Sequence, residues 1–384
     1  MPNTRLPRAT AMLAGAAALL TACSAPGTSG GGTASNTGPI KIAIVDAQSG
    51  QLSSLGDWER KGAQLAIDQW NAKGGINGRR IEFRVFDDQG DPTVGTNLAR
   101  RIASEGYVAM IGTAESAVTV AMAPTLQQNR IPNITSGQSP ALVAVKSPFL
   151  FLNGPTSTTY DETLVKYIVD TKGMKRIALI SNNGSFGKGE KGAFTASLAS
   201  RGITPVDSQV VTTDQKDFGA ALSTIRQKKP DLIFIGAEEV EAGLIVKQAR
   251  LLGIDVPFAG AAPLGTPVYV QTAGVANVEG SIVSSPYLSN ESSQAARDFA
   301  AAYKKAYGEE AELHGAKAYD GANIILTALQ SSGGATGQQL ADAIRATRYR
   351  GLLGDFAYDA TGVGIFATTI GIIRGGKLTA ADGG

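Results

Sequence analysis

VAMIGTAESAVTVAMAPTLQQNRIPNITSGQS, residues 108–139, is the stretch that decides the fold of this chain. It predicts a short apolar strand, a small polar loop, a helix, a second strand and a second polar loop. In a parallel sheet both loops emerge at the carboxyl ends of neighbouring strands, which is the edge where open α/β sheets bind their ligands. We therefore expect a ligand site at this edge.

The two polar loops contain Ser116 and Ser139, each just ahead of a predicted helix. The free N–H groups and the positive dipole end of a helix N-terminus favour an anion, and a carboxylate is the simplest such ligand. The alternative is that each serine only caps its own helix. Both interpretations are open at this point.

Apolar strands alternate with helices on both sides of this stretch. Further strands are predicted at residues 40–47, 80–88, 149–153, 176–181, 203–211, 231–237, 256–261 and 280–285. Further helices are predicted over 57–73 with Asp57 as N-cap, from Asp91-Pro92 to about Glu105, over 157–170, and from Phe186, Phe218 and Glu239. Residues 292–347 are expected to be mainly helical, and 354–376 to form a terminal strand pair. Two such series of βαβ units predict an α/β protein with two Rossmann-like, doubly wound lobes.

Length and composition agree with this prediction. A chain of 384 residues exceeds the size at which one hydrophobic core keeps growing, so two lobes are expected. The hydrophobic fraction of 43%, the charged fraction of 18% and the net charge of +2 are typical of a globular α/β protein. No basic stripe is interleaved with aromatic residues, which argues against nucleic acid as a partner.

The N-terminus has the features of an export signal. Arg5 and Arg8 precede the apolar run 9–20, and LTAC ends in Cys23, the only cysteine. This segment resembles a lipoprotein signal, in which cleavage precedes the cysteine and its thiol is acylated; the alternative is an ordinary secretory signal. Residues 24–38 are rich in Gly, Ser and Thr and predict a flexible tether. We expect a signal peptide at 1–22, a tether at 23–38 and an extracytoplasmic protein anchored by lipid to the cell membrane.

The sequence carries no recognisable catalytic apparatus, metal motif or cofactor motif. The only histidine, His314, has no second ligand at helical spacing and is expected at the surface or at a helix cap. GSFGKG (184–189) matches neither dinucleotide nor phosphate-loop spacing, and we expect a turn and helix start that line a cleft. Asp87 and Asp88 are adjacent in a predicted strand, so they face opposite ways and cannot act as an acid/base pair. We expect neither enzyme activity nor a cofactor or metal.

Several segments together carry a family resemblance. They are IVDAQSGQLSSLGD (44–57), AIDQWNAKGGINGRRIEFRVFDDQGDP (66–92), the Ser116 and Ser139 loops, LIFIGAEEVEAGLIVKQAR (232–250) and AYDGANIILTAL (318–329). Over nearly all of 40–377 the chain resembles the type I periplasmic solute-binding proteins of ABC importers, in particular the leucine/isoleucine/valine-binding branch. The resemblance implies two lobes, 39–154 plus 286–350 and 155–285 plus 351–384, which clamp a ligand. It also implies three hinge crossovers, near Gly154-Pro155, Ser285-Pro286 and 349–354.

The resemblance also implies roles for individual residues. Ser116 matches the serine that holds the ligand carboxylate, and Gly137 and Ser139 match the loop that contacts carboxylate and ammonium. Phe186 matches a second-lobe tyrosine that closes on the ligand. Leu55 matches an aromatic residue of the first-lobe pocket.

The amine half of the implied site differs from the family pattern. Ala262 stands where amino-acid-binding members carry an acid that pairs with the ligand ammonium. Glu238 stands where the family has another tyrosine, and with Glu239 as second choice it is a candidate replacement, while Glu241 is expected to be solvated. The alternative is that Glu238 and Glu239 only favour the positive end of the following helix. The remaining candidate ligand-binding residues lie in the same loops: Ser49, Thr113, Ala114, Glu115 and Gln138.

These observations predict a monomeric solute-binding lipoprotein that delivers a small carboxylate-bearing solute, an amino acid or a related compound, to an ABC permease. A ligand sensor that presents an amide or organic acid to a membrane receptor or kinase is the alternative within binding proteins. An anchored hydrolase would need a paired nucleophile and base, and the single histidine argues against it. A structural lipoprotein of the cell envelope would need no polar cleft.

Overall fold

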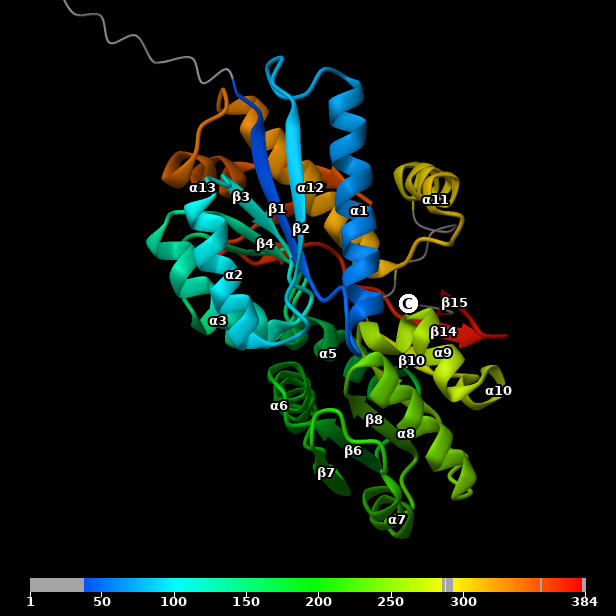
Figure 1. Ribbon diagram of the computed structural model, residues 1–384. Coiled ribbons are helices and arrows are strands. Elements are labelled where there is room, and N and C mark those ends of the chain that lie inside the picture. Colours follow the sequence, from blue (N-terminus) through cyan, green and yellow to red (C-terminus); the bar gives the residue numbers. More distant parts are fainter. Residues whose placement is uncertain (1–37, 285–286, 288–292, 353, 382–384) are drawn as a thin grey trace, which may run out of the picture. The chain divides into compact units, whose positions relative to one another are not determined.

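The computed structural model describes residues 38–284, 287, 293–352 and 354–381, and these form two separate, mainly parallel sheets with helices on both faces (Figure 1). The expected α/β class with two doubly wound sheets is confirmed. The predicted signal peptide, Cys23, most of the tether and the predicted crossover at Ser285-Pro286 lie outside the described residues. No helix in the described part of the chain has the length and apolar character needed to cross a bilayer.

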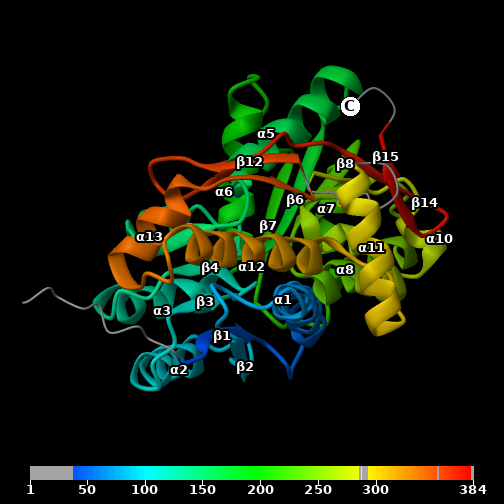
Figure 2. The same cartoon turned by 90° about the horizontal axis from the view of Figure 1, so that it is seen from above.

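The first sheet has the strand order β2-β1-β3-β4-β5 and is entirely parallel. Its strands are β1 (Ile40–Asp46), β2 (Ile81–Asp87), β3 (Ala109–Ile111), β4 (Asn133–Thr135) and β5 (Leu150–Leu152). One face packs against α1 (Ser53–Ala72), α12 (Leu313–Ser331) and α13 (Gly337–Ala346), and the other against α2 (Pro92–Ser104) and α3 (Ser116–Gln128). Both views show α1 beside α12 (Figures 1 and 2). The inner strands are buried on both faces and lack a regular alternation, whereas the edge strand β2 alternates between buried and exposed residues.

The second sheet has the order β15-β14-β10-β9-β8-β6-β7. Its parallel strands are β6 (Ile177–Asn182), β7 (Asp207–Val211), β8 (Leu232–Gly236), β9 (Phe258–Gly260) and β10 (Ile282–Val283). One face packs against α7 (Gly219–Gln227), α8 (Glu239–Leu251) and α9 (Pro267–Ala273). The other packs against α5 (Ser157–Val165), its π-helical continuation (Lys166–Thr171) and α6 (Ser185–Ala199). The short helices α4 (Ala141–Ala144), 262–265 and α10 (Val275–Val278), with α11 (Gln294–Tyr307), complete the described helices.

The C-terminal segment differs from the single strand pair that the sequence predicts. Strands β11 (Arg348–Gly351), β12 (Gly354–Tyr358) and β13 (Gly364–Ile365) form a small antiparallel sheet. A second hairpin, β14 (Gly371–Arg374) and β15 (Lys377–Ala380), extends the second sheet. Phe356 and Tyr358 of β12 are buried in the core of the first sheet. The chain therefore crosses to the second sheet between residues 365 and 371, later than the expected 349–354.

Two predicted helix starts have different outcomes. Asp91 is the N-cap of α2, as expected, and accepts hydrogen bonds from the backbone N–H groups of Thr93 and Val94. Asp57 is not the N-cap of α1, because that helix begins one turn earlier at Ser53. Asp57 instead lies inside the helix and pairs with cationic side chains one turn further along.

Candidate functional site

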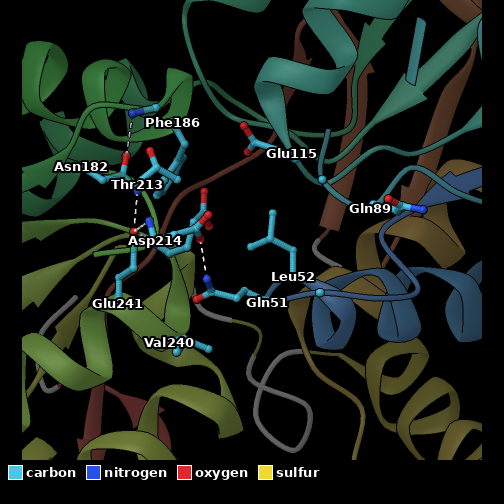
Figure 3. A pocket seen from close by; sticks show the side chains of 14 residues that line it. Gln51, Leu52, Gln89, Glu115, Asn182, Phe186, Thr213, Asp214, Val240 and Glu241 are labelled. Carbon is cyan, nitrogen blue, oxygen red and sulfur yellow. Dashed lines mark hydrogen bonds between the residues drawn. The ribbon is translucent and has the colours of Figure 1, made fainter. Parts of the chain in front are cut away.

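A cavity of about 310 Å³ lies between loops that follow strands of the two sheets (Figure 3). The first sheet contributes the loops after β1, β2 and β3, and the second contributes those after β6, β7 and β8. The strand order of the first sheet reverses between β1 and β3, and that of the second sheet between β6 and β8. The loops after these strands line the cavity, and such a reversal point is where doubly wound sheets bind ligands. The lining residues are Gly50, Gln51, Leu52, Gln89, Gly90, Glu115, Asn182, Gly184, Phe186, Thr213, Asp214, Glu238, Val240 and Glu241.

Glu115 is the carboxylate that the first sheet directs into the cavity. Its loop is held by Asp46, whose Oδ1 accepts a hydrogen bond from the Ala114 N–H at 2.7 Å. Glu115 is also the N-cap of α3, and its Oε1 accepts from the Ala117 N–H at 3.0 Å. Figure 3 shows this side chain pointing across the cavity toward the opposite wall. Burial raises the pKa of Glu115, and the charge of Glu241 raises it further.

Two further carboxylates, Glu238 and Glu241, come from the start of α8. Glu238 is the N-cap of that helix and is partly buried. Burial, followed by the charges of neighbouring acids, raises the pKa of Glu238 well above its usual range. Glu238 thus fits both earlier interpretations, because it lines the cavity and also begins a helix.

Glu241 is buried, with 3% of its surface exposed, so the expectation that it is solvated is wrong. Its Oε2 accepts from Asn182 Nδ2 at 2.6 Å, and its Oε1 accepts from the Asp214 N–H at 2.6 Å. The loop after β7 therefore folds over this side chain. Glu241 fixes two other lining residues in place.

Phe186 lies on the same wall, in the first turn of α6, and is 7% exposed. Gly184 is the N-cap of this helix and also lines the cavity. The segment GSFGKG is thus a turn and helix start beside a cleft, as the sequence indicates.

Ser116, Gly137 and Ser139 are brought together but lie outside the cavity lining. Ser116 Oγ accepts from the Ser139 N–H at 3.4 Å, and a Cβ at Gly137 would lie 3.0 Å from Ser116 Oγ. Ser139 Oγ donates to the carbonyl of Ser185 at 3.0 Å, which joins the first sheet's loop to the start of α6. Ser116 is not an N-cap, because Glu115 has that position. Ser139 is not an N-cap either, because Pro140 has that position before α4, but its Oγ accepts from the Ala141 N–H at 3.3 Å.

The other predicted site residues do not line this cavity. Ser49 is exposed and donates to Asp87 Oδ2 at 2.7 Å. Leu55 is buried in the first turns of α1, and Leu52 lines the cavity from that segment. Thr113, Gln138 and Ala262 are also buried. The hydroxyl of Thr113 donates to the Glu115 carbonyl, and the carbonyl of Gln138 accepts from the Ser157 N–H. Ala262 lines a separate cavity.

Sequence reasoning did not identify Gln51, Gln89, Asn182, Thr213, Asp214 or Val240 as lining residues. Each lies within a few residues of the carboxyl end of a predicted strand or at the start of the helix that follows. This position could have identified them from the sequence, because all loops that follow the carboxyl ends of parallel strands lie at the same edge of the sheet.

His314 was expected at the surface or at a helix cap; it is buried, so it is not at the surface, and it lies in the first turn of α12 beside the N-cap Glu312. Its Nδ1 lies 2.9 Å from Glu312 Oε2, and its ring stacks on Trp58 with centroids 6.4 Å apart. Lys317, one turn along α12, is also buried and donates to the Ser136 carbonyl at 3.0 Å. Burial lowers the pKa of Lys317 to about 8. These two side chains belong to a polar network separate from the cavity lining. No group of three or more His, Cys, Asp or Glu side chains in the described ranges could hold a metal ion.

Polar contacts join the two sides next to the cavity. Gln51 Nε2 donates to Asp214 Oδ1 at 2.7 Å, and Lys216 Nζ donates to Gln51 Oε1. Ser54, in the first turn of α1, donates to Glu239, the first residue of α8. These bonds connect the first sheet's loops and helices to those of the second.

Two doubly wound sheets whose switch points face one cavity define a protein that encloses a small ligand between lobes. The sequence pattern of the periplasmic binding protein family matches residues 39–376, and the chain belongs to this family. The predicted resemblance is confirmed. The chain is thus a binding protein of the transporter type and not an enzyme.

Individual relatives support this assignment. The chain is 29% identical over 222 residues to the Leu/Ile/Val-binding protein BraC3 of Rhizobium johnstonii, which covers 58% of this chain and 60% of that protein. It is 30% identical over 248 residues to the leucine-specific-binding protein of Salmonella typhimurium, covering 64% and 67%. The crystal structure of the branched-chain amino acid transporter substrate binding protein LivJ from Streptococcus pneumoniae, in complex with isoleucine, aligns with a TM-score of 0.83 at 26% identity. That alignment covers 89% of this chain and 98% of the other.

Proposed function

We propose that this protein is the solute-binding component of an ABC importer and captures an amino acid or a related small compound between its lobes. The observation that carries the proposal is the cavity lined from the carboxyl edges of both sheets. The amino-acid-binding names of the relatives support the solute class. The role implies an ABC permease as partner, with the protein acting as a monomer.

We also propose that the protein is held at the outer side of the membrane by acylation of Cys23. The support is the export signal that ends in the only cysteine, followed by a segment that has nothing to bury. One acyl chain alone binds a membrane weakly, so stable anchoring implies more than one acyl chain on this cysteine.

The lobes are proposed to close on the solute by a hinge. The first lobe is residues 39–154 together with the segment from about 286 to the β13 strand, and the second is 155–285 together with the β14–β15 hairpin. Bonds such as Gln51 to Asp214 and Ser139 to Ser185 join the two lobes around the cavity, so opening must break them. The wall residues come from both lobes, so the site is complete only when the lobes meet, and a bound solute therefore favours the closed form.

Within the site, Ser116 and Ser139 remain the proposed contacts for a solute carboxylate, and Glu238 the proposed contact for an ammonium group. Neither serine lines the cavity, but Ser139 donates to the carbonyl of Ser185, the residue before the lining residue Phe186, and Ser116 accepts from the Ser139 N–H. This position next to the cavity wall supports the first assignment. The position of Glu238 in the cavity wall supports the second, since Ala262 offers no acid.

The test combines identification of the solute with a measurement of closure. Small molecules released from the purified, denatured protein are identified by mass spectrometry, and the identified compound is added back to the refolded protein. We expect a raised melting temperature and a smaller radius of gyration by small-angle X-ray scattering. A protein that releases no solute, and whose melting temperature no amino acid or related compound raises, would refute the proposed function.

A further inference from the structure

The charges around the cavity are unbalanced. Glu115, Asp214, Glu238 and Glu241 line it, and no Lys, Arg or His among the described residues does. Glu241 is engaged with Asn182 and the Asp214 backbone, whereas Glu115 and Glu238 come from opposite lobes. Closure of the lobes therefore brings acidic side chains toward one another in a water-poor space, where their protonated forms are favoured unless a positive charge lies between them.

A fully buried carboxylate lies directly behind this wall. Glu190 on α6 has no exposed surface, and its Oε2 has no hydrogen-bond partner among the described residues. Its Cβ would lie 3.1 Å from a Cβ at Gly236, the last residue of β8, two positions before Glu238. The charge of Glu190 contributes to the raised pKa of Glu238. Acidic groups thus lie both in the cavity lining and in the layer beneath it.

Nearby cations do not balance this field within the lining. Lys216 donates to Gln51 and is not a lining residue. His314 and Lys317 are buried in the network with Glu312 and the Ser136 carbonyl. A buried cation between lobes needs an acidic partner, and buried acids stay protonated until a cation is placed beside them. The lining offers such acids and no cation of its own, so the positive charge is expected on the solute.

We propose that the solute carries a net positive charge, with an ammonium or guanidinium group held between Glu115 of the first lobe and Glu238 of the second. This inference rests on the proposed solute-binding function and assigns its substrate class: a basic amino acid or a diamine rather than an uncharged-side-chain amino acid. The solute cation then joins the lobes and favours the ionised forms of these acids.

A series of solutes of similar length separates charge from shape. Cadaverine carries two positive charges, lysine a net single positive charge, norleucine none and hexanoate one negative charge. We expect isothermal titration calorimetry to detect cadaverine or lysine binding at least about tenfold tighter than norleucine, with no binding of hexanoate. Charge-assisted hydrogen bonds in an enclosed site have this magnitude. Salt screens exposed charges far more than buried ones, so the preference for lysine over norleucine should persist at high salt if the lobes close over the solute.

Two outcomes distinguish the failure of this inference from the failure of the proposed function. Norleucine or leucine binding as tightly as lysine would overturn the charge assignment and leave solute binding intact. Cadaverine, lysine and arginine all failing to bind, while another amino acid does bind, would overturn it equally. If no amino acid or amine binds, the proposed function fails with it.

Variants locate the cation. Glu238→Gln and Glu115→Gln should each weaken binding of the preferred cation about ten- to a hundredfold and reduce the preference over norleucine. Glu82→Gln is the matched control, because Glu82 is exposed on β2 away from the cavity lining, and it should leave affinity unchanged. Unchanged affinity in both cavity variants would refute this placement of the charge.

Proton release is a second readout. Burial favours the protonated form of Glu238, and so do the charges of its acidic neighbours, which are Glu115 before α3, Glu241 and Glu239 on its own helix and Glu190 on α6. A bound cation favours the ionised form, so binding should release protons and tighten as pH rises. Calorimetry in buffers of different ionisation enthalpy measures this release. Binding of a cation without proton release near pH 7 would contradict the role of Glu238.

Discussion

Replacing Gly62 with alanine is expected to destabilise the protein, although alanine is the better helix former. Gly62 lies in the middle of α1, where that helix crosses α12 at Gly315. A Cβ at position 62 would lie 2.0 Å from the carbonyl oxygen of Gly315 and 2.7 Å from its carbonyl carbon. Both are backbone atoms, so no side-chain rotation can relieve the contact.

The magnitude follows from two opposing effects. Alanine stabilises a helix interior by about 1 kcal/mol relative to glycine. Ordinary contact of a Cβ begins at 3.4 Å, so the helices must separate by about 1.4 Å at this point. Overpacking of this kind costs about 1–3 kcal/mol, and a collision with backbone lies at the upper end. The expected net destabilisation is about 2 kcal/mol.

Urea denaturation followed by tryptophan fluorescence measures this effect, since both tryptophans, Trp58 and Trp70, are on α1. Gly192→Ala is the matched control, because Gly192 is exposed within α6 and a Cβ there would meet nothing within 4 Å. The control should be stabilised by about 1 kcal/mol. A Gly62→Ala protein that unfolds at or above the urea midpoint of the wild type, at unchanged m-value, would refute the close crossing of α1 and α12.

Three further predictions concern the anchor, the site and pH. Cys23→Ala should abolish lipid labelling and move the protein out of the detergent phase, and unchanged membrane retention would contradict acylation. Ser116→Ala should weaken solute binding, measured by calorimetry, about tenfold or more. The melting temperature without solute should change little, because Ser116 Oγ accepts a long bond of 3.4 Å from the Ser139 N–H. Lost stability at unchanged affinity would favour a purely structural role. Burial raises the pKa of Glu190 and of Glu239 to about 7, so the folded state holds these protons more tightly than the unfolded chain, whose glutamates have ordinary values near 4. The stabilisation is complete below the unfolded pKa and is lost as pH rises through 7, so the melting temperature without solute should fall between pH 5 and pH 8; a constant or rising value would contradict the burial of these acids as carboxylic acids.

The order of strands and helices was predictable because each has a local signal. Strands buried on both faces are apolar runs, and Asp91-Pro92 or the glycines of NAKGGING mark helix ends directly. The start of α1 has no such signal: its N-cap is Leu52, which makes no capping hydrogen bond, so the helix begins there because tertiary packing permits it. The same reason explains why Asp57 was the wrong N-cap.

The candidate site was predictable only in part. The sequence places Glu115, Phe186 and Glu238 after the strands that reach the cavity, and they line it. The burial of Glu241 depends on a loop that closes over it from β7, and the burial of His314 depends on Trp58 of α1. Contacts between segments so far apart in sequence leave no local pattern.

The contacts across the cavity mouth have a consequence for the rate at which solute leaves. The hydrogen bonds of Gln51 with Asp214 and Lys216 are exposed to solvent, and exposed polar pairs contribute about 0–1 kcal/mol each. Such contacts break and reform quickly, so they add little to the barrier for opening. The residence time of the solute is therefore governed by its contacts inside the cavity. The hydrogen bonds of Gln51 add little to the free energy that a permease must supply to open the lobes.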